Sequence, residues 1–358
     1  MAPGGGGGGG GSFTAIPIID LSLADDPASE AGLLERLRHA LVHVGFLYVV
    51  NHGVPEETVS AVTEALPRLF ALPAAAKEEV ALANSPHFLG YSGDGAEMTA
   101  GAADRREQVE FATELVDGWR PGLPLRERLR GPNQWPSSYP GLRPIVEAYV
   151  SEMTLLGERF LRLVAKALSL PPEAFLPFLS DQHRLKLGVG PHKDSSGWWT
   201  FLLQASPPHV GGLQALNRGG GWVDVPALPG SFVVNIGQAF EVVTGGACRA
   251  TTHRVLSGPL ERFSVPFFQG VRRDLTKDEA VGSLAGHFGR SEIRGLLLPT
   301  AAAMEEESAE GRGVDSAFLQ GRYDTWGESQ LRTKIRSHRD VGKKFYPEVF
   351  DQYVNDDR

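Results

Sequence analysis

The chain has 358 residues, 42% of them hydrophobic, and a formal net charge of −8 at pH 7. This length and composition suit one enzyme-sized domain with a substantial core. The acidic balance argues against a nucleic-acid-binding protein, which would carry a basic patch, and Cys248, the single cysteine, excludes an internal disulfide and indicates a reducing compartment.

The N-terminal stretch is rich in glycine, with an unbroken run from Gly4 to Gly11. It lacks the basic and apolar regions of a signal peptide, and no apolar run in the chain approaches the roughly 18 residues of a membrane helix. We therefore expect a disordered tail over residues 1–14, a cytoplasmic protein and no membrane partner.

Residues 15–140 are expected to form an N-terminal region of helices and strands. Leucines at intervals of three or four from Leu33 to Leu41 predict a helix, and FLYVV at 46–50 predicts a strand. Residues 141–182 contain a long amphipathic helix that packs on the β core and ends before Pro171. Its apolar stripe consists of Val146, Val150, Met153, Leu156, Phe160, Leu163 and Ala167.

From residue 183 the pattern changes to short strands separated by Gly and Pro. The predicted strands are WTFLLQ (199–204), GLQAL (212–216), WVDVP (222–226), SFVVNIG (231–237) and RFSVPFF (262–268). Such spacing indicates a mainly β sandwich or barrel over residues 183–270, with α additions. Residues 271–358 read as a C-terminal helical region with a mobile insertion at 301–315.

His192 and Asp194 lie two residues apart, so on a strand both side chains project to one side and can bind one metal ion. His253 is the candidate third ligand. Two imidazoles and one carboxylate on one face of an octahedron leave three positions open, as in Fe(II) oxygenases. His-x-Asp alone is a weak signal, and a lone histidine is more often hydrogen-bonded or exposed to solvent. Because His192, Asp194 and His253 occur in this order, the three residues together are stronger evidence for a metal site than any one of them alone.

Arg262 and Ser264 are also two apart and can reach one pocket. Their structural interpretation is an exposed edge with a weak ion pair to Glu261. Their functional interpretation is a clamp in which the guanidinium and the hydroxyl bind one carboxylate of a small dicarboxylate. A buried cation there would balance the charge of the metal site with its dianion.

With these residues, the chain resembles the 2-oxoglutarate and Fe(II)-dependent dioxygenase superfamily, in the isopenicillin N synthase-like branch. The resemblance covers nearly the whole chain and includes fungal-type segments. They are IPIIDLS (16–22), GFLYVVNHGVP (45–55), PHFLGYS (86–92), GPNQWP (131–136) and WGESQLRTKIRSH (326–338).

The resemblance implies a double-stranded β-helix, or jelly roll, flanked by N-terminal and C-terminal helices. It also implies that His192, Asp194 and His253 bind Fe(II) and that Arg262 and Ser264 bind the cosubstrate 2-oxoglutarate. The implied reaction uses O2 to hydroxylate, desaturate or cyclise a small organic molecule, a role in secondary metabolism, with release of succinate and CO2.

The chain departs from the family at one point. Members carry a Tyr that contacts 2-oxoglutarate between a strand like HRLKL (183–187) and the iron motif, whereas here Leu187 runs straight into Gly188. Loss of a short piece explains this best, because both flanks keep the pattern. The alternatives are a different way of holding the cosubstrate, an Fe(II) oxidase that does not use 2-oxoglutarate, and an inert homologue.

Substrate contacts are the least specific predictions. Phe88 and Tyr91 could form a lid over the pocket, one of Trp198 and Trp199 should face inward, and Phe268 or its neighbour Phe267 could line the site. For each of these aromatic side chains, packing in the core is the favoured interpretation. The partner is expected to be a small molecule, and the oligomeric state is open.

Overall fold

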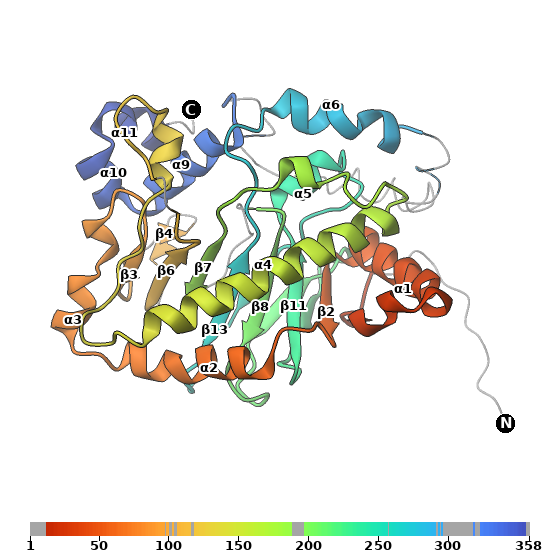
Figure 1. Cartoon of the computed structure of the whole chain (residues 1–358), viewed down its shortest axis with the longest axis horizontal. Helices are drawn as coiled ribbons and strands as arrows, with labels where there is room; N and C mark the ends of the chain where they lie inside the picture. The colour runs from red at the N-terminus through yellow and green to blue at the C-terminus, as the bar shows by residue number, and fades with distance from the viewer. Residues whose placement is uncertain are drawn as a thin grey trace.

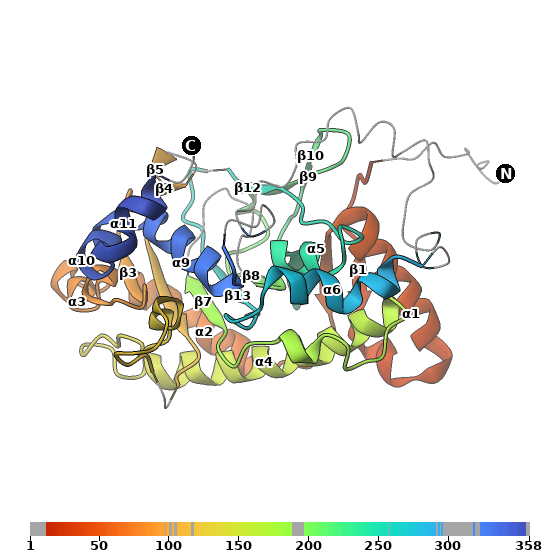
Figure 2. The same cartoon turned by 90° about the horizontal axis from the view of Figure 1, so that it is seen from above.

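The computed structural model describes residues 12–96, 98–99, 102–103, 106–115, 118–187, 197–256, 258–290, 293, 295, 318 and 323–355. The predicted tail up to Gly11 and the predicted insertion at 301–315 lie outside these residues. The described part is layered, with a large sheet in the middle, helix α4 on one of its faces and a small sheet on the other (Figures 1 and 2).

The main sheet has eight strands in the described residues. Every neighbouring pair is antiparallel except β1 and β2, which are parallel. Both outer strands, β1 and β3, are only three residues long. The order across the sheet is β1 (Ile18–Asp20), β2 (Phe46–Val50), β11 (Ser231–Ile236), β8 (Trp199–Gln204), β13 (Ser264–Phe268), β7 (Arg184–Leu187), β6 (Gln108–Ala112) and β3 (Gly90–Ser92).

The small sheet is antiparallel, with the strand order β10 (Trp222–Asp224), β9 (Leu213–Leu216) and β12 (His253–Val255). A buried cluster that includes Phe46, Leu202 and Val233 of the main sheet and Leu213 of the small sheet joins the two. The predicted strands and the sandwich are therefore confirmed. The last predicted strand starts two residues later than expected, at Ser264, and β4 (Met98–Thr99) and β5 (Ala102–Ala103) form a separate pair.

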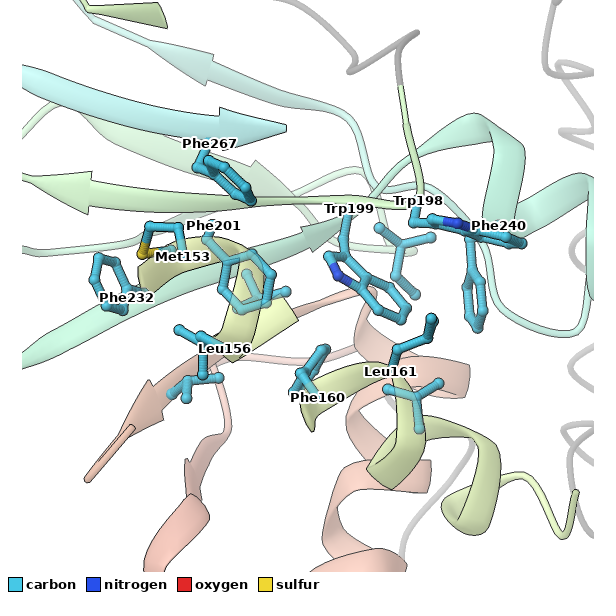
Figure 3. Close-up of a cluster of buried hydrophobic side chains, with 14 of the residues drawn as sticks. Met153, Leu156, Phe160, Leu161, Trp198, Trp199, Phe201, Phe232, Phe240 and Phe267 are labelled. Carbon is cyan, nitrogen blue, oxygen red and sulfur yellow. The ribbon is translucent and has the colours of Figure 1, made fainter. Parts of the chain in front are cut away.

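Helix α4 (Leu142–Ala167) lies across the face of the main sheet that points away from the small sheet (Figure 1). Its predicted apolar stripe is entirely buried. Figure 3 shows the side chains of Met153, Leu156 and Phe160 turned toward the sheet residues Trp199, Phe201 and Phe267. The Phe160 ring meets those of Trp199 and Phe201 edge-on, at centroid distances of 5.1 and 5.6 Å. This contact fixes the sheet to the helix layer.

The other helices surround this core. In the described part of the chain, no helix is long and apolar enough to span a membrane. The remaining helices are α1 (Pro27–His39), α2 (Glu56–Phe70), α3 (Ala74–Glu79), α5 (Gln238–Val243), α6 (Lys277–Phe288), α9 (Trp326–Ser337), α10 (Arg339–Phe345) and α11 (Pro347–Val354), with short 3-10 or π turns at Leu21–Asp25, Ala40–Val44, Leu82–Asn84, Leu125–Leu129 and Leu176–Phe178.

The C-terminal helices α9, α10 and α11 pack at the β3 and β6 end of the main sheet, around a cluster of their own (Figure 2). Leu331 and Ile335 of α9 and Tyr346 are fully buried there. The predicted C-terminal helices are thus confirmed, and helix α9 lies beside the main sheet.

Candidate active site

The two faces of the main sheet differ in chemistry because side chains alternate along each strand. On β13, Val265 and Phe267 point into the core against α4. Ser264 and Phe268 therefore point to the opposite face, which looks toward the small sheet. Thr200 and Asn235, both buried, lie on that same face. We call this polar surface the inner face.

Arg262 stands two residues before Ser264, at the entrance to β13, and is largely buried. Its Nη2 donates to Oε1 of Gln204 on β8 at 3.2 Å. Removal from water lowers the pKa of Arg262 below its ordinary value. Among the residues that the structure describes, no carboxylate forms an ion pair with Arg262, so the surface pair with Glu261 is not seen there. Within the described residues, Arg262 is therefore a partly buried cation whose guanidinium is hydrogen-bonded to a neutral amide.

Ser264 is 1% exposed, and its Oγ is buried without a hydrogen-bond partner in the described part of the chain. A buried hydroxyl without a partner costs free energy, and few such groups persist unless a ligand or water satisfies them. The two members of the predicted clamp thus lie side by side, and both have unused capacity to bind an anion. An incoming carboxylate would satisfy both.

His253 begins β12 and is buried, opposite Ala215 of β9. Its Nδ1 lies 3.2 Å from the carbonyl oxygen of Thr251, and its ring packs edge-on against Phe46 at a centroid distance of 5.4 Å. In the tautomer that donates from Nδ1 to this carbonyl, Nε2 carries the lone pair that a metal ion needs. The surroundings of His253 therefore fit a metal ligand.

The other two predicted iron ligands, His192 and Asp194, lie outside the described residues, which end at Leu187 and resume at Gly197. Within the described ranges, no group of three or more His, Cys, Asp or Glu side chains could hold a metal ion. The junction between Leu187 and Gly188, where the family's Tyr is missing, falls at the edge of the same gap.

Of the four predicted substrate contacts, Phe268 alone lies on the inner face. Phe88 is fully buried and stacks on Tyr346, with ring centroids 5.6 Å apart. Trp198 is buried against Phe175 and Phe240.

The Trp198 ring points into the same core as that of Trp199, so the expectation that only one of this pair faces inward is wrong (Figure 3). The reason is that Trp198 precedes the strand, where strict alternation does not hold. Tyr91 shares the face of its partner Val109, away from the inner face, and donates to Glu107.

A group of charged residues on the inner face was not predicted from the sequence. Glu110 of β6 is 2% exposed and forms ion pairs with Arg184 and Lys186 of β7 and with Lys334 of α9. We call these four residues the Glu110 cluster. One signal was present in the sequence, because Arg184 and Lys186 are two apart in a strand and must share a face. The position of Lys334 has no such local signal.

Comparison with known proteins identifies the family. Residues 16–138 match the family model described as "non-haem dioxygenase in morphine synthesis N-terminal". Residues 163–271 match the family model of the 2OG-Fe(II) oxygenase superfamily. The 2-oxoglutarate-dependent dioxygenase frbJ of Dothideomycetidae sp. (strain 11243) is 40% identical over 368 residues, which cover 94% of each chain.

Two solved structures show the same fold. A 2OG-Fe(II) oxygenase family protein from Caulobacter crescentus superposes with a TM-score of 0.63 at 23% identity, covering 84% of this chain and all of the other. The structure of JOX2 in complex with 2OG, Fe and JA has a TM-score of 0.58 at 28% identity, covering 73% of this chain and 76% of JOX2.

The jelly-roll fold, the fungal-type resemblance and the enzyme class predicted from the sequence are thereby confirmed. The chain belongs to the 2OG-Fe(II) oxygenase superfamily and is a 2-oxoglutarate-dependent dioxygenase, an enzyme that uses Fe(II), 2-oxoglutarate and O2 to oxidise a small molecule.

Proposed function

We propose that in this chain His192, Asp194 and His253 hold the Fe(II) and that Arg262 and Ser264 bind the carboxylate of 2-oxoglutarate that is distant from the metal. The observation that carries the proposal is the pairing of a buried guanidinium without a carboxylate partner, among the described residues, with a buried hydroxyl without any partner. Both are satisfied by one anion.

The clamp would act by position and charge. Gln204 holds the Arg262 guanidinium on the inner face, and a fork of N–H donors can accept a carboxylate at two oxygens. The Ser264 hydroxyl would add a third hydrogen bond. Fe(II), when bound, supplies the open coordination positions at which 2-oxoglutarate and dioxygen react. The protein directs the cosubstrate so that its 2-oxo acid end reaches those positions.

The missing Tyr favours two other functions: an oxidase that does not use 2-oxoglutarate, and an inert protein. Neither accounts for Arg262 and Ser264, which among the described residues lack a carboxylate partner and a hydrogen-bond partner respectively, because a desolvated cation without a counter-charge is costly to keep. The clamp is therefore a reason to expect 2-oxoglutarate binding even without the Tyr.

The deciding experiment is an anaerobic titration of the Fe(II)-loaded protein with 2-oxoglutarate. Chelation of the metal by the 2-oxo acid gives a weak visible charge-transfer band. A saturating band supports the proposal, whereas iron uptake without a band points to the oxidase and failure to take up iron points to the inert protein. His253→Ala should abolish both iron uptake and the band.

We propose that the substrate is a small organic molecule that binds beside the cosubstrate; the structure of JOX2, 28% identical, was solved in complex with 2OG, Fe and JA. We propose Phe268 as one of its contacts, because this half-buried ring shares the inner face with Ser264. We also propose that the protein is cytoplasmic and binds no nucleic acid, on its single cysteine and acidic charge. Burial raises the pKa of the Cys248 thiol, which keeps it protonated and unreactive.

A further inference from the structure

We propose that Thr251 is a positioning residue of the iron site, because it ties the loop that carries His253 to the segment of chain that leads into β2. The inference rests on the proposed function in one respect, namely that His253 is an iron ligand. It is carried by two hydrogen bonds of Thr251 and by the close approach of Gly45 to the same loop.

The segment that leads into β2 is fixed to the main sheet. The π turn Ala40–Val44 ends at Gly45, whose N–H donates to the carbonyl oxygen of Ala40, five residues back, at 2.8 Å. Such turns are rare and are frequently found at functional sites. The carbonyl oxygen of Gly45 in turn accepts the N–H of Ile236 on β11 at 3.1 Å. The end of the turn therefore keeps its place relative to the main sheet.

Thr251 joins this fixed segment to His253. Its hydroxyl donates to the carbonyl oxygen of Val44 at 2.7 Å. Its own carbonyl oxygen lies 3.2 Å from Nδ1 of His253, and because a carbonyl oxygen can only accept, this contact is a hydrogen bond when Nδ1 carries the proton. A displacement of Thr251 would therefore change where the imidazole lies and which of its nitrogens can bind a metal ion.

The loop and the turn are packed too closely to move independently. Gly45 has φ +71°, and a Cβ there would collide with the Thr251 hydroxyl and lie 2.6 Å from the carbonyl oxygen of Arg249. A glycine at this position thus allows the loop to approach the turn. The next residue, Phe46, places its ring edge-on against the His253 imidazole, with centroids 5.4 Å apart.

The position of His253 relative to the cosubstrate clamp depends on how the two sheets are joined. His253 belongs to the small sheet, whereas Arg262 and Ser264 belong to the main-sheet strand β13 and its entrance. A cosubstrate that contacts both the metal and the clamp has to span the two sheets. Their relative placement is therefore a requirement of the proposed function.

Hydrogen bonds give this placement a direction that apolar packing cannot give. The buried cluster between the two sheets contributes an attraction that does not depend on direction. At the β10 edge of the small sheet, Tyr48 and Gln204 of the main sheet donate to the carbonyl oxygens of Pro226 and Val225, at 2.6 and 3.1 Å. At the β12 edge, beside the predicted iron ligand, the hydroxyl of Thr251 makes the corresponding bond.

The competing explanation is purely structural: the Thr251 hydroxyl stabilises the fold and has no effect on the metal. The two explanations differ in what they predict for the folded protein. A structural bond, when lost, lowers the free energy of unfolding and leaves the affinity for Fe(II) unchanged. A positioning bond, when lost, weakens Fe(II) binding by a protein that is still folded.

The test is an anaerobic calorimetric titration of the metal-free protein with Fe(II). Thr251→Val replaces the hydroxyl by a methyl group and should weaken Fe(II) binding about 10-fold or more, the usual effect of removing an outer partner of a metal ligand. Thr251→Ala should do the same, whereas Thr251→Ser, which keeps the hydroxyl, should retain the wild-type affinity. The charge-transfer band of the 2-oxoglutarate complex should also move in wavelength in Thr251→Val, because it reports on the geometry around the metal.

Two control variants match the substitution. Thr252→Val changes the neighbouring half-buried threonine, whose hydroxyl has no hydrogen-bond partner among the residues that the structure describes. Thr154→Val removes a bond of the same length, 2.7 Å, from a threonine hydroxyl to the carbonyl oxygen of Val150 within α4. Both should keep the wild-type affinity for Fe(II). Urea unfolding of the metal-free proteins shows which variants are folded and compares their stability.

The outcomes separate this inference from the proposed function. A folded Thr251→Val or Thr251→Ala protein with the wild-type affinity for Fe(II) overturns the inference alone, provided that His253→Ala loses the metal. A Thr252→Val protein that loses as much affinity as Thr251→Val also overturns it, because the hydroxyl is then not the cause. A wild-type chain that takes up no Fe(II) overturns the proposed iron site and this inference together.

Discussion

Arg262 has to satisfy two demands, since it must stay charged in a desolvated place and still be available to a ligand. The hydrogen bond from Arg262 to Gln204 satisfies both demands, because the neutral amide oxygen of Gln204 orients the guanidinium and leaves its charge available to a ligand. Arg262→Met should therefore raise the dissociation constant for 2-oxoglutarate by about 100-fold or more, with iron binding retained. Titration of the charge-transfer band measures the change, and Ser264→Ala should cost only about 5-fold, the value of one neutral hydrogen bond. Equal losses in both variants would refute this division of roles.

His183 gives the protein a pH-dependent stability. Its Nδ1 accepts the backbone N–H of Gly270 at 2.9 Å, and burial lowers its pKa from 6.5 to about 4. Because the folded pKa lies below the unfolded one, the unfolded chain takes up the proton first as the pH falls. The stabilisation is complete above pH 6.5 and is lost as the pH falls toward 4, a change of about 3 kcal/mol.

Urea unfolding between pH 4 and 7.5 tests this. The wild-type free energy of unfolding should fall with decreasing pH more steeply than that of His183→Gln, which cannot be protonated. His209→Gln, at an exposed position, is the control and should keep the wild-type slope. If the His183→Gln slope matches the wild type, His183 does not carry this linkage.

The predictable part of the site is local in sequence. Arg262 and Ser264 are two apart on one strand, so periodicity alone puts them together, and His253 follows from its order in the chain. The Glu110 cluster joins three segments that are distant in sequence, with Lys334 on a C-terminal helix. In the sequence, its charged residues look like ordinary surface residues, and only the fold shows that they are largely buried. The aromatic contacts were ambiguous because a strand residue can face either side, and only the sheet register decides it.

Among the elements, the entry to β8 is tightly constrained. Gly197 has φ +90°, and a Cβ there would lie 2.4 Å from the carbonyl oxygen of Gln269. Gly197→Ala should therefore combine backbone strain with a clash against backbone and lower the free energy of unfolding by about 3 kcal/mol or more. Gly220→Ala is the control, because φ is +78° but a Cβ meets nothing within 4 Å, and it should cost about 1 kcal/mol. Urea denaturation compares the two, and similar losses would show that strain alone matters.

Element identities were easier to predict than their ends. Strands β8, β9 and β11 are dense in aromatic and aliphatic residues and were found within one residue of the prediction. Strand β13 starts late because Phe263 donates its N–H to the Ser206 side chain instead of a ladder carbonyl. A side-chain acceptor of this kind comes from another segment, so the pattern of apolar residues does not reveal it.

At the scale of the whole molecule, helix α4 and the main sheet share a large buried apolar contact. Phe160→Ala removes a fully buried ring between Trp199 and Phe201 and should lower the free energy of unfolding by about 3 to 5 kcal/mol. Leu155→Ala, on the same helix but 61% exposed, should change it by no more than about 0.5 kcal/mol. Thermal unfolding followed by circular dichroism distinguishes them. A Phe160→Ala protein as stable as Leu155→Ala would mean that the sheet does not depend on this helix.

The short outer strands of the main sheet protect the protein against aggregation. An open sheet edge presents unpaired N–H and C=O groups on which another chain can add a strand. Here the edge strands β1 and β3 offer three residues each, and β1 ends in the charged Asp20. The longer, strongly apolar strands β8 and β11 are covered by neighbours on both sides. Partly unfolded forms that lose β1 would expose β2 and become the species most prone to fibril formation.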